Sequence, residues 1–363
     1  MRSKLLADPA EVEPPRYARD RDVFHDKQGR VYVAMGHIQP RDRVLSFLKY
    51  IPDSLGRWRF GDTRYRRLFQ SGADNMTKVA RHVPPEFLRK DTHFRTTLVE
   101  VPKRDVARYF MPEPRLQEIR DSGPQDVLEN DALGLAEILN ETLEIPFNRL
   151  GVAGSILWKA HDPEQSDVNL NVYGLDESWK LNNGFFEVVR ENDKVDMKQL
   201  NEWALTMSRL FSMIPALTPA DTRLLFSRKK LLIYNKRPIN VTPILLPDEY
   251  PIFHGNESYT PITSMPIRVN MEITDDKYGL FMPALYLGES EGIPLVEDEI
   301  VTRIMLYAGT FKGLVKTGDK VEVSGVLQRV ISERRDFDPF YQMMVGTAGF
   351  ERKEYIKITK AGW

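Results

Sequence analysis

The stretch Leu150-Gly-Val-Ala-Gly-Ser-Ile-Leu-Trp-Lys-Ala-His-Asp-Pro-Glu-Gln-Ser-Asp-Val-Asn-Leu-Asn-Val-Tyr-Gly174 is the most informative part of the chain. An apolar run leads to Gly154-Ser155, a polar loop ends at Asp167, and residues 168–172 alternate between apolar and polar. This pattern predicts a strand, a tight turn that opens a short helix, a loop and a second strand. The turn exposes backbone N–H groups and a hydroxyl, which suit an anion. A carboxylate beside it could hold a divalent cation.

This layout resembles the nucleotidyltransferases of the DNA polymerase beta type. Their signature is Gly-Ser or Gly-Gly, a spacer of roughly 9–13 residues, and Asp-apolar-Asp/Glu-apolar, a motif that carries a mechanism. Here the spacer 156–166 has 11 residues, and Asp167 stands at the first metal position. The second position lies two residues on, on the same strand face, and is Asn169, whose amide oxygen can coordinate but carries no charge. The resemblance implies Mg²⁺ as cofactor and a nucleoside triphosphate as substrate.

The resemblance also assigns roles to the turn, and each role has a structural alternative. Gly154 and Ser155 would hold the β- and γ-phosphates; alternatively they form a tight turn in which Ser155 caps the helix. Lys159 would reach a phosphate, although an exposed lysine is equally natural there. Asp167 is either a metal ligand or the Asx-turn residue that starts a strand. Catalytic members carry a third carboxylate on a later strand, but residues 239–246, the corresponding predicted strand, contain no acid.

Composition restricts the chemistry and the compartment. The chain of 363 residues has no cysteine, so disulfides, thiolate metal sites and cysteine nucleophiles are excluded. Its six histidines form no closely spaced pair, which disfavours zinc. No apolar run is long enough for a bilayer span or a secretory signal. We therefore expect a cytoplasmic protein without a membrane partner.

The predicted elements define an α+β protein in four parts. Residues 1–20 form a flexible arm, and residues 21–120 form a basic β-rich module. Residues 121–250 form the nucleotidyltransferase-like core, a mixed sheet with helices. Residues 251–363 form a β-rich module, and its Lys316-Thr-Gly-Asp turn into an alternating strand resembles small barrels of the oligonucleotide-binding type. Over the whole chain, this order resembles the archaeal predicted nucleotidyltransferase family.

Charge is distributed unevenly between these parts. Residues 1–120 contain 25 Lys/Arg and 16 Asp/Glu, a balance of +9, so the remainder carries −10. The most basic stretch lies at residues 57–69, where arginines could contact phosphates and rings could stack on bases. The arginines concerned are Arg57, Arg59, Arg64 and Arg66. Alternatively, the rings belong to the core and the arginines to a solvated face.

Two main functions follow. The first is transfer of a nucleoside monophosphate from a nucleoside triphosphate to an acceptor, RNA above all, with Asp167 and Asn169 in a degenerate metal site. The alternative is a catalytically inactive nucleotidyltransferase-like protein that binds RNA or a ribonucleoprotein. A protein-interaction scaffold with neither ligand is the third.

Overall fold

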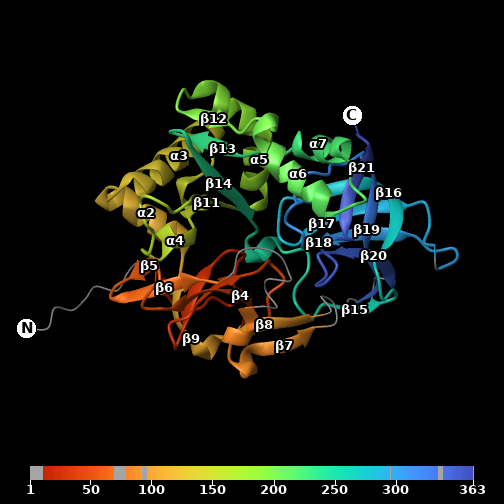
Figure 1. Cartoon of the computed structure of the whole chain (residues 1–363), viewed down its shortest axis with the longest axis horizontal. Coiled ribbons are helices and arrows are strands. Elements are labelled where there is room, and N and C mark those ends of the chain that lie inside the picture. The colour runs from red at the N-terminus through yellow and green to blue at the C-terminus, as the bar shows by residue number, and fades with distance from the viewer. Residues whose placement is uncertain (1–10, 69–78, 92–95, 295, 334–337, 363) are drawn as a thin grey trace, which may run out of the picture.

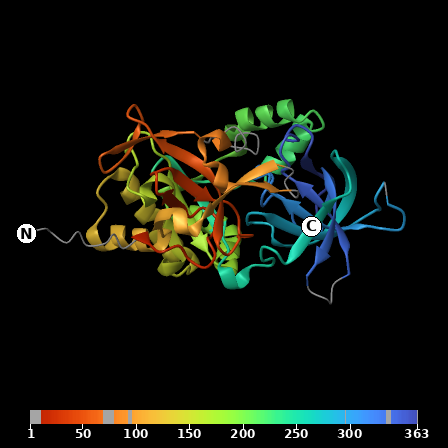
Figure 2. The ribbon, with the colours of Figure 1, turned by 90° about the horizontal axis from the view of Figure 1, so that it is seen from below.

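The protein is built from three β-sheets, and this confirms the expected α+β class. The computed structural model describes residues 11–68, 79–91, 96–294, 296–333 and 338–362. In Figure 1 the helices and strands of the middle part lie above the N-terminal sheet, and the C-terminal strands lie to one side. Figure 2 shows the C-terminal strands beside the other two parts from below. Within the described residues, no helix is long and apolar enough to cross a bilayer.

The N-terminal sheet has nine strands in the order β1-β9-β2-β3-β4-β6-β5, with β8 pairing both β4 and β7. Its strands are β1 (Glu11–Val12), β2 (Val23–Asp26), β3 (Val31–Ala34), β4 (Arg43–Pro52), β5 (Trp58–Phe60), β6 (Thr63–Arg67), β7 (Leu88–Asp91), β8 (Thr96–Pro102) and β9 (Val106–Phe110). The β2–β3 hairpin turns at Gly29, whose φ of 75° suits glycine.

The arm expected over residues 1–20 differs from the structure in its second half. β1 pairs with β9, and Ala18 is fully buried. The guanidinium of Arg19 donates to both carboxylate oxygens of Glu113, at 2.5 and 2.9 Å, and lies 4.2 Å above the ring of Tyr173. This segment is therefore tied to the rest of the chain by charge pairing, which the Pro-rich composition did not reveal. Residues 1–10 lie outside the described part.

The middle part has a five-stranded sheet in the order β10-β11-β14-β13-β12. Its strands are β10 (Leu150–Val152), β11 (Val168–Tyr173), β12 (Val195–Met197), β13 (Leu232–Tyr234) and β14 (Arg237–Ile244). Its helices are α2 (Pro112–Ser122), α3 (Val127–Leu143), α4 (Gly154–Leu157) and α5 (Leu175–Glu191). Helix α3 begins where Asp126 accepts hydrogen bonds from the N–H groups of Leu128 and Glu129. Its buried residues recur at helical spacing, so one face covers the sheet.

Helix α2 carries two prolines in its first turn, Pro112 and Pro114, which in the sequence alone are typical of a loop. Proline is tolerated in the first turn of a helix, where its missing N–H has no intrahelical partner. Pro112 is the first residue of α2, and the helix lies against β10, where a Cβ on Gly151 would come within 2.6 Å of Pro112. The helical layer therefore begins before residue 121.

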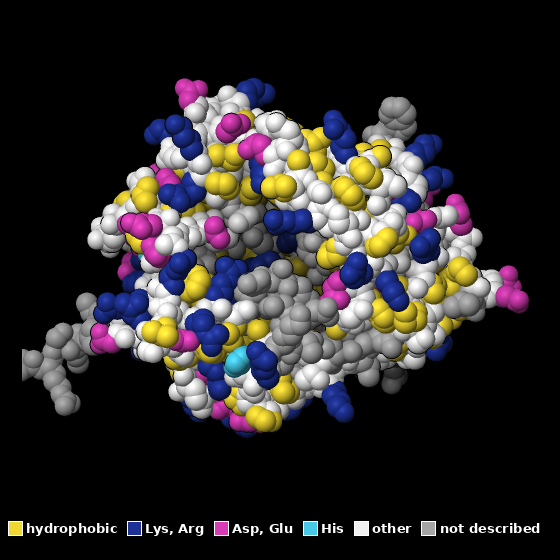
Figure 3. Space-filling view, in the orientation of Figure 1, with side chains coloured by type: hydrophobic (Ala, Val, Ile, Leu, Met, Phe, Trp, Pro, Cys, Tyr) yellow, Lys and Arg dark blue, Asp and Glu magenta, His cyan; other side chains and the backbone are white. Residues whose placement is uncertain are grey.

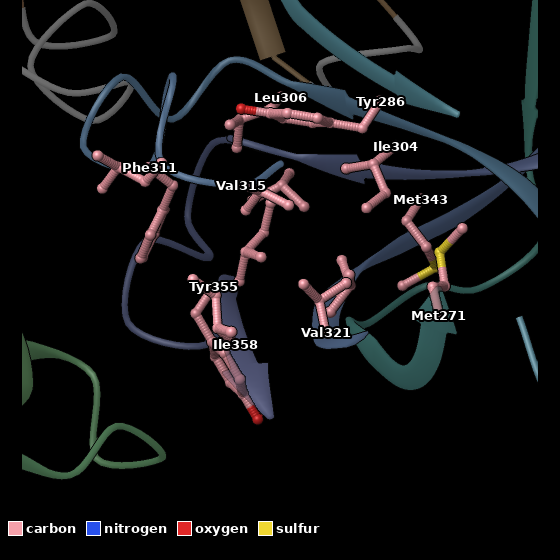
Figure 4. Close-up of a cluster of buried hydrophobic side chains, with 14 of the residues drawn as sticks. Met271, Tyr286, Ile304, Leu306, Phe311, Val315, Val321, Met343, Tyr355 and Ile358 are labelled. Atoms are coloured by element: carbon pink, nitrogen blue, oxygen red, sulfur yellow. The ribbon is translucent and has the colours of Figure 1, made fainter. Parts of the chain in front are cut away.

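The C-terminal strands form a closed circuit. Strand β16 (Ile267–Tyr278) pairs with β17 (Ala284–Ser290), β17 with β18 (Val301–Leu306), β18 in parallel with β20 (Phe340–Val345), β20 with β19 (Lys320–Ser332), and β19 with β16. At Gly325, strand β19 passes from β16 to β20; a Cβ there would lie 2.5 Å from the carbonyl of Met344. Strands β15 (Glu257–Pro261) and β21 (Tyr355–Lys360) also pair with β19. Figure 4 shows the apolar side chains inside this circuit.

Two helices inserted between β12 and β13 pack against these strands. A 3-10 turn (Leu200–Trp203) leads into α6 (Ala204–Met213), and α7 (Pro219–Phe226) comes next. Trp203, Leu210 and Phe226 share one apolar cluster with the C-terminal strands. The remaining described 3-10 turns are Ala80–His82, Pro85–Phe87, Lys103–Asp105, Phe147–Arg149 and Pro247–Glu249.

Trp158 joins the middle part to the N-terminal sheet. This residue directly follows α4, and it is only 1% exposed. The ring centroid lies 5.1 Å from that of Tyr65, 5.2 Å from His25 and 5.4 Å from Tyr50. Burial and the nearby charge of Arg108 lower the pKa of His25 to about 3, so this imidazole is neutral inside the cluster.

Replacing Trp158 should destabilise the protein strongly. We expect Trp158→Ala to lower the free energy of unfolding by ~3–5 kcal/mol, since a fully buried ring is lost from a contact between two sheets. The midpoint of urea unfolding measures this effect. The half-buried Trp179 supplies the control, Trp179→Ala, whose loss should be smaller. An equal or larger loss in the control would contradict the central place of Trp158.

The same cluster predicts acid sensitivity. Below pH 6.5 the unfolded chain protonates His25, whereas the folded chain does so only near pH 3, so stability falls as pH drops through this window, by up to ~1.4 kcal/mol per pH unit. His25→Phe should lessen this fall, and His254→Phe, at an exposed position, should leave it unchanged. Thermal unfolding at several pH values tests both.

Candidate functional site

The candidate metal positions meet where β11 and β14 lie side by side. The strands are parallel, and Asn169 is paired in register with Asn240. The residue of β14 that lies beside Asn169 is therefore an amide and not a carboxylate. Asp167 directly precedes β11 and is exposed, as is Asn240, whereas Asn169 is half-buried. The three positions thus hold one carboxylate and two amides.

The two amides are hydrogen-bonded to their surroundings. The Nδ2 atom of Asn240 donates to Oδ1 of Asn169 over 3.4 Å, and Nδ2 of Asn169 donates to the carbonyl of Asp167 over 3.3 Å. Both bonds are long and therefore weak. They turn one amide oxygen towards a neighbouring N–H group instead of leaving it free for a cation. A site with a single carboxylate fits Mg²⁺ poorly, because this hard cation is held mainly by charged oxygen ligands.

The Gly-Ser turn packs closely against the side-chain amide of Asn169. Gly154 has φ of 66°, and a Cβ there would lie 3.0 Å from Nδ2 of Asn169. The N–H of Ala153 also donates to the carbonyl of Asn169 over 2.8 Å. Ser155 is only 6% exposed, and the capping position of α4 is Ala153, so Ser155 does not cap this helix. The turn and the strand are therefore brought together as the sequence predicts, and the capping alternative is wrong.

Lys159 and His161 are held by the helical layer. The Nζ atom of Lys159 lies 2.8 Å from Oε1 of Glu118 on α2, and Nε2 of His161 lies 2.6 Å from Oδ2 of Asp126. Asp126 has a lowered pKa: burial opposes ionisation, but the hydrogen bonds from Glu129 and His161 outweigh it. These contacts anchor the loop between α4 and β11 to α2 and α3.

Asp126, Glu129 and His161 also form a cluster whose ligand atoms lie within 4.8 Å of one another. The oxygens of Asp126 already accept from two backbone N–H groups and from His161. Those of Glu129 accept from the guanidinium of Arg115 and from the N–H of Gln125. Because these acceptors are occupied, the cluster is explained as a brace within the middle part.

A cation that sequence reasoning missed interacts with the candidate site through its charge. Lys49 lies within β4 and is half-buried, and the negative charge of Asp167 attracts its ammonium group. Burial, together with repulsion by Arg67 and Arg21, lowers its pKa to about 7 despite the attraction of Asp167. Nothing in the sequence around Lys49 indicates this role, because it depends on how β4 lies against the middle part.

The predicted arginines lie on the β5–β6 hairpin. Arg57, Arg59, Arg64 and Arg66 are all exposed. Arg59 and Arg64 are directly opposite each other across the two strands, an arrangement of like charges that is unfavourable without an anion. Arg66 pairs with Asp53 at 2.6 Å, and Arg59 lies 3.6 Å from Asp62.

The rings of this hairpin lie on its other side. Tyr65 is buried, and Trp58 and Phe60 pack in the cluster around Trp158. The alternative that these rings belong to the core is therefore correct. The hairpin presents charge to solvent, without stacking surfaces from these three rings.

No family model, curated protein or solved structure matches the chain. The function is therefore argued from the geometry of this chain.

Adding two carboxylates beside Asp167 should create a metal site. We expect the double variant Asn169→Asp, Asn240→Asp to bind Mn²⁺ roughly tenfold or more tightly than the natural chain, because affinity for hard cations rises with the number of charged ligands. Calorimetric titration with Mn²⁺ measures the change. The control is Asn256→Asp, on a different part of the chain. If the double variant and the control bind alike, Asn169 and Asn240 do not stand at a cation position.

Proposed function

We propose that the protein is a catalytically inactive nucleotidyltransferase-like protein that binds RNA. The observation that carries the proposal is the pairing of Asn169 with Asn240 beside Asp167. Transfer of a nucleoside monophosphate by two metal ions needs carboxylates that hold both ions against the attacking and leaving oxygens. With two amides at these positions, much of that electrostatic hold is lost.

The order of elements in the middle part supports a relationship to the polymerase beta-type nucleotidyltransferases. A helix, a strand, a Gly-Ser turn, a short helix and an Asp-bearing strand follow one another as α3, β10, Gly154-Ser155, α4 and β11. This is the order that the polymerase beta-type resemblance implies. The five-strand circuit of the C-terminal part is compatible with an oligonucleotide-binding barrel. Both likenesses favour a nucleic-acid ligand.

Charge supports RNA as the ligand. The excess of Lys and Arg lies in the N-terminal third, and four exposed arginines stand on one hairpin. Phosphate contacts by such side chains release counterions, so binding weakens linearly with the logarithm of salt concentration. Since the metal positions lack two carboxylates, this binding should not need Mg²⁺.

The first test compares RNA binding across salt concentrations. Changing Arg57, Arg59, Arg64 and Arg66 together to Glu should weaken binding of a single-stranded RNA by ~100-fold at about 0.1 M salt and reduce the salt slope by up to ~3. Fluorescence anisotropy measures both. A charge-matched control changes four exposed arginines elsewhere to Glu: Arg120, Arg190, Arg268 and Arg352. Equal losses of RNA affinity in both variants would mean that net charge alone, and not the hairpin, determines binding.

The second test addresses transfer itself. We expect no release of pyrophosphate from ATP, GTP, CTP or UTP with Mg²⁺ and RNA present. Turnover that disappears in Asp167→Ala would overturn the inactive assignment and favour the degenerate enzyme.

A further inference from the structure

One basic hollow adjoins the candidate site, and a second basic hollow shares a wall with the first. The first, of 260 Å³, lies between α5, β14 and the loop at residues 309–314, and reaches Asn240. The second, of 300 Å³, lies between α5 and the loop at residues 197–200. Residues 228–230 line both hollows and form a ridge between them. Figure 3 shows Lys and Arg side chains in the central depression of the surface.

The walls carry cations and no described carboxylate. Seven cations line one or both hollows: Arg21, Lys198, Arg228, Lys229, Lys230, Lys312 and Lys316. Arg228 is neutralised by the buried carboxylate of Asp319 behind the wall. Lys230 donates to the backbone carbonyl and side-chain oxygen of Asn182, which carry no charge.

Two other lysines form no ion pair among the described residues, although the charge of Asp20 attracts Lys312. Lys229 lies 5.3 Å from the ring of Trp203 and 5.0 Å from that of Phe226. Lys312 is half-buried and forms no ion pair with a carboxylate among the described residues. The hollows therefore hold a surplus of positive charge that the described wall does not balance.

Burial and mutual repulsion disfavour the charged lysines. The pKa of Lys312 falls to about 8, because burial and the charges of Arg21 and Lys229 outweigh the attraction of Asp20. The pKa of Lys230 also falls to about 8, through burial and Lys316. An anion between these groups would oppose both shifts, because it favours the charged form of each lysine.

The second hollow also contains an aromatic ring. Phe186 of α5 lines it and is 60% exposed, which is unusual for a large apolar side chain. An exposed ring beside cations is the arrangement that binds unpaired bases, since each base offers a stacking face while the phosphates contact the cations. The two hollows are each at or below the usual size of a small-ligand pocket, ~300 Å³ or more. They therefore suit successive units of an extended chain better than one compact ligand.

We propose that one strand of RNA runs through the two hollows, with its phosphates beside Lys229, Lys230, Lys312 and Lys316 and a base on Phe186. The inference rests on the proposed RNA binding and adds the path of the strand. It places the strand across the ridge towards Asn240, on a surface separate from the arginine hairpin.

Binding should also take up protons. At pH 8 about half of the Lys230 and Lys312 side chains are neutral, and phosphates favour their charged forms. The strand should therefore bind with an uptake of up to about one proton, and its affinity should fall as pH rises from 7 to 9. Calorimetry in two buffers of different ionisation enthalpy measures the uptake.

The decisive experiment uses the full chain, an oligouridylate of about ten nucleotides, and three variants. Lys312→Met and Lys316→Met should each reduce the salt slope by about 0.7, and Lys312→Met should also reduce the proton uptake and raise Tm. Phe186→Ala should weaken oligouridylate binding about tenfold and leave binding of inorganic triphosphate unchanged. Lys360→Met, at an exposed position outside both hollows, is the control.

The possible outcomes separate this inference from the proposed function. If the hollow variants bind RNA like the natural chain while the arginine hairpin variant does not, the path is wrong and RNA binding stands. If inorganic triphosphate binds and RNA does not, the hollows hold a free phosphate chain, and both the path and the proposed function fail. A smaller salt slope of RNA binding in Lys312→Met and Lys316→Met, but not in Lys360→Met, supports the proposed path of the strand.

Discussion

The insertion of Trp158 between two sheets is the contact on which the arrangement of the site depends. This residue directly follows the short helix of the Gly-Ser turn, so fixing its ring also fixes the turn. The ring contacts Tyr65 of β6 and Tyr50 of β4, and the neighbour of Tyr50 is Lys49, whose charge interacts with that of Asp167. One buried side chain thereby sets where the basic N-terminal module stands relative to the candidate site.

The chemistry of the site follows from what this arrangement brings together. At the junction of β11 and β14, amides stand at Asn169 and Asn240, and the charge of Lys49 on the N-terminal sheet interacts with that of Asp167. A carboxylate-rich edge would attract cations, whereas one carboxylate beside Lys49, Arg21 and Arg67 favours anions. The charge balance at this junction therefore favours the phosphate chain proposed above over a metal-bound triphosphate.

Several elements could be read directly from the chain. The Gly-Ser turn, α3 and the alternating strand β11 lie where the pattern predicts, because each depends on local preferences: a left-handed glycine, an N-cap and period-two apolar residues. The pattern failed at α2, since prolines that begin a helix resemble prolines that end one. It also failed at residues 11–20, which are held by the pair of Arg19 and Glu113, 94 residues apart in the chain.

The sequence by itself determined the identity of the site residues Gly154, Asp167 and Asn169, and the absence of an acid between residues 239 and 246. Tertiary structure alone decided that Asn240 is the partner of Asn169, that the charge of Lys49 interacts with that of Asp167, and that residues 228–230 stand between two hollows. The physical reason is that strand register and the packing of separate sheets join residues far apart in the chain. Local spacing carries no information about such pairs.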